Sequence, residues 1–153
     1  MDAEKKLALM QNTYAASVAE TVNTYSRMNV LDRIVEQKAE RQAQSAGPMM
    51  AMLGICGPEE VFLTLSGVFG CANWQVEKTE SGFTATATAC KLCALSKKMG
   101  GANPCRGWCL DPMAAMVSKL TTGSADFHVK STLMEGEQCQ VEVSLSKQAA
   151  ATA

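Results

Sequence analysis

Residues 83–89 read Phe-Thr-Ala-Thr-Ala-Thr-Ala, a strict alternation of apolar and hydroxyl-bearing side chains. Because successive side chains of a β-strand point to opposite faces, this period of two predicts a strand whose alanine face lets a helix approach closely. Residues 79–82, Thr-Glu-Ser-Gly, are typical of a turn, and a segment beginning at Trp74 precedes them. We therefore expect a β-hairpin over residues 74–89.

A second hairpin is expected near the C-terminus. Residues 127–133 and 139–145 are interpreted as its strands, with Glu135-Gly136-Glu137 as the turn between them. The chain thus runs in the order helices, hairpin, helices, hairpin. This order predicts an α+β domain with N-terminal helices and an antiparallel sheet of about four strands, built from two hairpins with a helical pair between them.

The N-terminal segment is expected to be helical. Residues 4–46 contain neither proline nor glycine and are rich in helix-forming residues. Apolar residues recur along them at spacings of three and four: Leu7, Met10, Tyr14, Val18, Val22, Tyr25 and Met28. One long helix and a helical hairpin bent near Asn29 both fit. The apolar stripe either covers the domain's own sheet or packs against a second copy, which would make a homodimer through residues 1–46.

Proline and glycine divide the rest of the helical sequence. Gly47-Pro48 is expected to end the first segment. Asp111 is expected to cap a later helix in which Pro112 is the first helical residue. Further helices are predicted over residues 49–56 (short and buried), 58–69, 91–99 and 113–120.

The composition is that of one globular domain. The chain has 153 residues, of which 47% are hydrophobic and 19% charged. We expect a single domain over residues 1–153, with an α+β core over residues 58–146 and a frayed tail over residues 147–153. The formal net charge of −1 provides no long-range field for nucleic acid or for a membrane surface. No apolar run is long enough for a membrane span and no signal peptide is visible, so a cytoplasmic protein is expected.

The strongest chemical signal is a cluster of cysteines. The chain has seven, an odd number that argues against a disulfide framework. Cys90, Cys93, Cys105 and Cys109 have the spacing C-x2-C-x11-C-x3-C. Two such pairs can close a tetrahedral site, so these four residues are predicted metal ligands, with zinc as the first candidate and an iron–sulfur cluster as the alternative.

Other interpretations of the cysteines stay open at this stage. Cys90 and Cys93 could be small buried hydrophobic residues, or they could form a redox pair at a helix N-terminus. The remaining cysteines, Cys56, Cys71 and Cys139, are expected in the core rather than as ligands, although Cys139, on a strand, could also reach the metal site. His128 is the only histidine, and the strand alternation places it on the solvent face, so no catalytic role is expected for it.

The order of these elements carries a resemblance. From Gly82 to Val143 the chain has a strand ending in Cys90, a helix, Cys109-Leu110-Asp111 opening another helix, and Gly136-Glu-Gln-Cys139 opening a last strand. This stretch resembles the C-terminal half of the L-2-amino-thiazoline-4-carboxylic acid hydrolase family. More distantly, it is similar to 4-vinyl reductase domains, which bind small molecules.

The resemblance implies a hydrolytic reaction on a small heterocycle that contains sulfur and nitrogen. Either a cysteine-bound zinc would activate water, or a thiolate of Cys90 or Cys109 would attack the ring carbon. Asp111 would be the acid–base group, unless it only caps its helix. The alternatives are a small-molecule-binding or sensor module that zinc holds together, and an iron–sulfur or thiol redox component.

Overall fold

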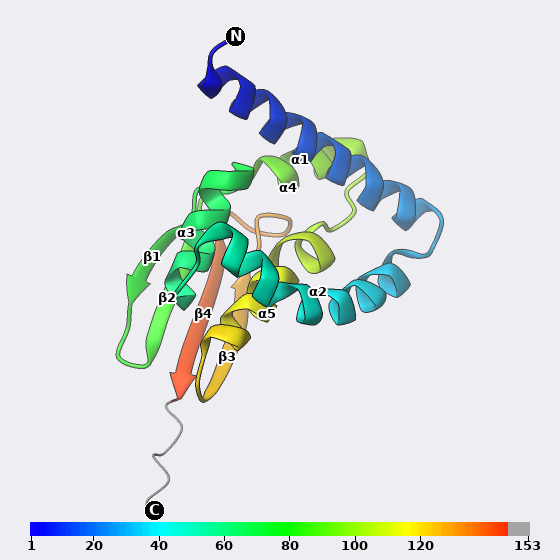
Figure 1. Cartoon of the computed structure of the whole chain (residues 1–153). Coiled ribbons are helices and arrows are strands. Elements are labelled where there is room, and N and C mark those ends of the chain that lie inside the picture. Colours follow the sequence, from blue (N-terminus) through cyan, green and yellow to red (C-terminus); the bar gives the residue numbers. More distant parts are fainter. Residues whose placement is uncertain (147–153) are drawn as a thin grey trace, which may run out of the picture.

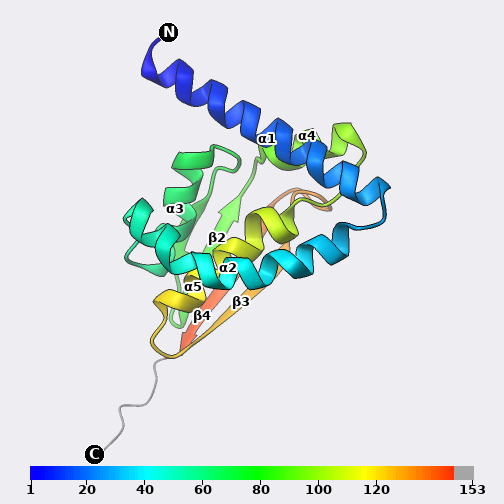
Figure 2. The same cartoon turned by 45° about the vertical axis from the view of Figure 1, so that its right-hand side comes forward.

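The computed structural model describes residues 1–146, which form helices on one side of a four-stranded antiparallel sheet (Figures 1 and 2). The predicted α+β class is confirmed. The predicted frayed tail, residues 147–153, lies outside the described residues. The elements in chain order are α1 (Ala3–Arg27), α2 (Leu31–Leu53), α3 (Pro58–Phe69), β1 (Gln75–Lys78), β2 (Gly82–Ala87), α4 (Lys91–Met99), a kinked turn η1 (Cys105–Cys109), α5 (Leu110–Leu120), β3 (Ser124–Ser131) and β4 (Cys139–Ser146).

The two predicted hairpins form and join along their second strands. The strand order is β1-β2-β4-β3, so β4 at the C-terminal end of the fold lies inside the sheet. The alternation in β2 continues across the pairing with β4, because Phe83 is opposite Val143 and Ala85 is opposite Val141. One face of this strand pair is buried: Phe83, Ala85, Ala87, Cys139, Val141 and Val143.

Aromatic packing holds α3 against this face. The Phe62 ring is fully buried and meets the Phe83 and Trp74 rings edge-on, at centroid distances of 5.7 and 5.1 Å. It also stacks on the Phe127 ring at 6.0 Å. Burying such large side chains is the main source of stability in a core, so Phe62 fixes α3 on both hairpins at once.

The N-terminal helices separate at Asn29, whose backbone has a positive φ of 58°. Of the two open alternatives, the break near Asn29 is the one that forms, but α1 packs mainly on α4, while α2 packs on α5 (Figure 2). Val18 and Val22 of α1 are buried against Leu92. The apolar stripe thus covers this domain over the C-terminal half of α1. In its N-terminal half the apolar residues Leu7, Leu9 and Met10 are exposed, and a homodimer through this helix stays a prediction.

The expected helix end at Gly47-Pro48 is wrong, because α2 continues to Leu53 with Pro48 inside it. A proline in a helix loses one hydrogen bond and crowds the residue before it. Here the preceding residue is a glycine without a Cβ atom, and Ala46 and Met50 on either side are buried in the core. The predicted separate helix over residues 49–56 is therefore the last turn of α2, which ends at Gly54 with a φ of 68°.

The length and hydropathy of each helix can be compared with what a membrane span requires. Within residues 1–146, no single helix is both long and apolar enough to cross a membrane. Helices α2 and α3 reach the required length and hydropathy only together, and they are bent by 74° relative to each other.

Candidate functional site: a thiol cluster beside an apolar cavity

Three of the four predicted metal ligands form a chain of sulfur atoms. Cys90 is the N-cap of α4, and its Sγ accepts a hydrogen bond from the Cys93 backbone N–H at 3.4 Å. The Sγ atoms of Cys93 and Cys105 are 3.8 Å apart, and both residues are about 5% exposed. Cys105 reaches this place because residues 100–104 form the predicted loop, in which Gly100 and Gly101 have positive φ angles.

The surroundings of these thiols favour their protonated form. A hydrogen bond with the Cys105 thiol is the main reason why the pKa of Cys93 is raised to about 12. A hydrogen bond with the Cys93 thiol, followed by burial, raises the pKa of Cys90 well above the usual value for cysteine. Since the thiolate is the reactive form, both residues are weak nucleophiles at neutral pH.

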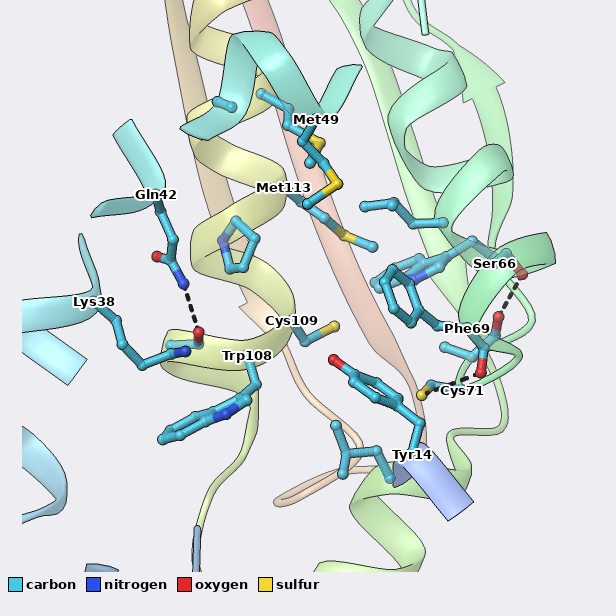
Figure 3. A pocket seen from close by; sticks show the side chains of 18 of the residues that line it. Tyr14, Lys38, Gln42, Met49, Ser66, Phe69, Cys71, Trp108, Cys109 and Met113 are labelled. Atoms are coloured by element: carbon cyan, nitrogen blue, oxygen red, sulfur yellow. Dashed lines mark hydrogen bonds between the residues drawn. The ribbon is translucent and has the colours of Figure 1, made fainter. Parts of the chain in front are cut away.

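The fourth predicted ligand, Cys109, faces an apolar cavity (Figure 3). Burial is the main reason why the pKa of its thiol is raised well above the usual value, and the nearby thiols of Cys90, Cys139, Cys93 and Cys71 raise it further, in that order. Six of the seven cysteines therefore belong to one region of the fold.

The remaining cysteines divide between the core and the surface. Cys139 is buried, as expected, and Cys71 is partly buried at the cavity wall. Burial raises the pKa of both thiols to about 11. The expectation of a core position is wrong for Cys56, which is exposed beside the end of α2. It follows Ile55, which is buried in the core, and its backbone N–H donates a hydrogen bond to Glu60 Oε2 at 2.8 Å.

The arrangement of sulfur atoms differs from the predicted four-cysteine site. Within residues 1–146, no three Cys, His, Asp or Glu side chains are placed so that they could hold one metal ion. The zinc site at Cys90, Cys93, Cys105 and Cys109, and the alternative iron–sulfur cluster, thus stay predictions from spacing.

Asp111 does not act as the expected cap. The helix begins before it, at Leu110, and no side chain caps this helix end by a hydrogen bond. The Asp111 Oδ2 atom instead accepts the Gly107 N–H at 2.9 Å and lies 4.0 Å from Arg106 Nε. The carboxylate therefore closes η1 by holding a backbone in which Gly107 has a φ of 80°. Its predicted acid–base role remains untested, and Asp111 is not among the residues that line the cavity.

The cavity lies where α1, α2, α3 and α5 meet η1 (Figure 3). It has a volume of about 240 Å³. Most of the wall is apolar and comes from aromatic and sulfur-containing side chains: Tyr14, Met49, Phe69, Cys71, Trp74, Trp108, Cys109, Met113 and Met116. A concave apolar site with few polar groups is the usual form of a small-molecule site.

A small set of polar groups stands at one side of this cavity. Gln42 of α2 donates a hydrogen bond from Nε2 to the Gly107 carbonyl oxygen at 2.6 Å, which fixes η1 to α2. Lys38, one turn earlier, places its Nζ atom 4.7 Å from the centre of the Trp108 ring. Across the cavity, the Tyr14 side chain points inward beside Phe69, with ring centroids 4.8 Å apart (Figure 3).

Burial shifts the pKa values of two of these groups, Lys38 and Tyr14. Burial lowers the pKa of the Lys38 ammonium, and Arg41 lowers it further. Burial also raises the pKa of the Tyr14 hydroxyl, followed by the effects of Cys71 and Cys109. No carboxylate among residues 1–146 pairs with Lys38. The cavity thus presents one positive charge and one neutral hydroxyl to a ligand.

The sequence patterns identified the cysteines but not most of the residues that line this cavity. Trp108 lines the cavity, and His128 is exposed as expected. Lys38 and Gln42 carry no local motif, because they look like ordinary solvated positions of a long helix. Only the crossing of α2 over η1 turns them inward.

Comparisons with known proteins give no further guide. No family model matches the chain, and neither does any curated protein or any solved structure.

Proposed function

We propose that this protein is a small-molecule-binding module whose cavity takes a compact, largely apolar ligand with a negatively charged group, such as an aromatic or heterocyclic carboxylate. The observation that carries the proposal is a ready-formed apolar cavity with a single ammonium group at its side. Its volume of about 240 Å³ is below the roughly 300–1,000 Å³ of pockets for drug-sized ligands, which favours a ligand of about one ring.

The charge of the ligand follows from Lys38. Its ammonium is held over the Trp108 ring and has no acidic partner within residues 1–146. A ligand carboxylate would supply that partner, and charge-assisted hydrogen bonds are about twice as strong as neutral ones. The apolar part of the ligand would then lie among Met113, Phe69 and the Cys109 thiol.

Binding fits this chemistry better than catalysis does. The two cysteines that line the cavity, Cys71 and Cys109, both have raised pKa values and are therefore neutral thiols at physiological pH. Asp111 accepts the Gly107 N–H and is not among the residues that line the cavity. Hydrolysis of an aminothiazoline carboxylate accordingly stays a prediction from the resemblance, although such a compound has the proposed size and charge.

Tryptophan fluorescence tests the proposal directly, because both tryptophans of the chain, Trp74 and Trp108, line the cavity. The protein would be titrated with benzoate and with neutral benzamide. We expect benzoate to change the emission and to bind more tightly. Lys38→Met should weaken benzoate binding about tenfold, because it removes one charge-assisted contact. Lys98→Met, at an exposed position on α4, should leave binding unchanged.

A steric pair of variants serves as the control for location. Ser45 is exposed at the edge of the cavity, and its neighbour Gln44 is exposed but does not line it. Ser45→Tyr should obstruct the entrance and abolish binding, whereas Gln44→Tyr should have no effect. Equal affinity of all variants for benzoate would overturn the proposed site. Turnover of an aminothiazoline carboxylate would show that the protein is an enzyme rather than a binding module.

A further inference from the structure

The contact between Cys93 and Cys105 has a consequence beyond ligand binding. These two thiols are 12 positions apart in sequence, and each is enclosed, yet their Sγ atoms touch at 3.8 Å. The fold holds both ends of this contact. Cys93 is in the first turns of α4, and Cys105 is fixed by a hydrogen bond from its N–H to the Asn103 side-chain oxygen at 2.8 Å.

We propose that Cys93 and Cys105 are a disulfide-forming pair that a peroxide oxidises. This pairing differs from the Cys90–Cys93 pair that the spacing suggests. A disulfide bond is about 2.05 Å long, so the two sulfur atoms need to approach each other by less than 2 Å from their present contact. The proposal does not depend on the ligand-binding function.

An open groove supplies the route for the oxidant. It runs along α4 and is lined by Cys90, Cys93, Lys91 and Lys97, whereas Cys105 is not part of its wall. A peroxide entering the groove therefore reaches Cys93 first. Cys93 attacks the peroxide through its minor thiolate form, so this step is slow at neutral pH. The Cys93 sulfur becomes a sulfenic acid, the O–O bond breaks, and the peroxide is reduced to water or an alcohol.

The second step completes the bond without a further oxidant. The Cys105 sulfur attacks the Cys93 sulfur, the S–S bond forms, and the S–OH bond breaks. The leaving hydroxide takes the proton of the Cys105 thiol and departs as water. In total, two thiols lose two electrons and two protons to one peroxide.

Position explains why Cys105, and not Cys90, resolves the sulfenic acid. The Cys90 sulfur is engaged by the Cys93 backbone N–H as the N-cap of α4, and forming a bond to Cys93 would break that cap. Within residues 1–146, no backbone group bonds to the Cys105 sulfur, which already touches the Cys93 sulfur. Closure of this pair leaves α4 capped.

Peptide mapping of the intact wild-type protein tests the proposal. The reduced protein would be treated with one equivalent of hydrogen peroxide, blocked with iodoacetamide and digested with trypsin. The positions of lysine and arginine separate the candidates, because Cys93 falls in peptide 92–97, Cys105 in 99–106, Cys90 in 79–91 and Cys109 in 107–119. We expect the main cross-linked species to join 92–97 to 99–106, with a mass two hydrogens below the sum of the two peptides.

Two variants complete the test. Cys109→Ser should keep the cross-link, and Cys105→Ser should lose it while Cys93 becomes trapped as a sulfenic acid that dimedone labels. A main product that joins 79–91 to 92–97 would overturn the proposal, as would peptides 92–97 and 99–106 that stay separately alkylated after peroxide treatment.

Discussion

The Asn23 side chain on α1 donates a hydrogen bond from Nδ2 to the Ser96 Oγ atom on α4 at 3.0 Å. Asn23 is 2% exposed and Ser96 is fully buried, so both polar groups depend on protein partners. Asn23 Oδ1 also accepts the Ala102 N–H at 2.9 Å. One amide thereby ties α1 to α4 and to the loop that brings Cys105 to Cys93.

Asn23→Ala is predicted to destabilise the protein by about 1–3 kcal/mol, because it leaves the half-buried Ala102 N–H without its acceptor and removes the donor to the Ser96 Oγ atom, which keeps only its own bond to the Ala102 carbonyl oxygen. Urea denaturation measures the change in the free energy of unfolding. Asn12→Ala on the exposed side of the same helix is the control, and it should change stability by less than about 0.5 kcal/mol. Equal effects of the two variants would show that the amide network does not hold α1 in place.

Gly100→Ala is predicted to disturb the same junction. Gly100 has a φ of 144°, and a Cβ atom there would lie 2.7 Å from Asn23 Oδ1. Both backbone strain and the close contact oppose the change, so we expect a loss of about 1–3 kcal/mol in urea denaturation. Gly67→Ala in α3 is the matched control, since a Cβ atom there meets nothing within 4 Å and an alanine favours a helix. Unchanged or increased stability of Gly100→Ala would contradict the described loop.

Local sequence patterns predicted part of this structure and missed the rest. Local patterns predicted the hairpins around Gly82 and Gly136 and the helix over residues 91–99, because strand alternation and helix spacing act over a few neighbours. The end of α2 was missed because the buried positions Ala46 and Met50 override a local Gly-Pro signal. The cysteine pattern identified the sulfur-rich region, but it did not predict which sulfur atoms meet.

The cavity is formed by residues that are far apart in the sequence. Tyr14, Lys38 and Trp108 meet only because α1 crosses α4 and α2 crosses η1. Local sequence places Tyr14 on the apolar stripe of α1, but it does not distinguish Lys38 from an ordinary solvated helix position. Their convergence therefore had to be seen in the fold.

Burial of Cys139 predicts a loss of stability at alkaline pH. Burial raises its pKa from 9.0 to about 11 in the folded protein, so this thiol stabilises the fold fully below pH 9. As the pH rises from 9 to about 11, the unfolded chain releases the proton and the folded chain keeps it. Its contribution then falls by about 1.4 kcal/mol per pH unit.

Cys139→Ala should reduce the slope of stability against pH by that amount. Urea denaturation at pH 8, 9, 10 and 11 under reducing, oxygen-free conditions gives the slope for both proteins. The comparison with the wild type cancels the effects of other groups that titrate in this range, including Tyr14. Identical slopes for the two proteins would show that Cys139 is not buried as described.

Closure of the Cys93–Cys105 pair predicts a more stable oxidised protein. A cross-link over a loop of this length stabilises by about 3 kcal/mol, because it restricts the unfolded chain. Thermal denaturation before and after peroxide treatment should show a higher midpoint for the oxidised wild type and no rise for Cys93→Ser. A lower midpoint in the oxidised wild type would indicate that the bond distorts η1.

The most direct test of the proposed function uses the methionine methyl groups as reporters of ligand position. Three of the ten methionines, Met49, Met113 and Met116, line the cavity, whereas Met1, Met10, Met28 and Met52 are exposed elsewhere. NMR of protein labelled at the methionine methyl carbons, recorded with increasing benzoate, is predicted to show saturable shifts of the three cavity signals. Shifts confined to the exposed methionines, or no shifts at millimolar benzoate, would contradict a carboxylate-binding cavity.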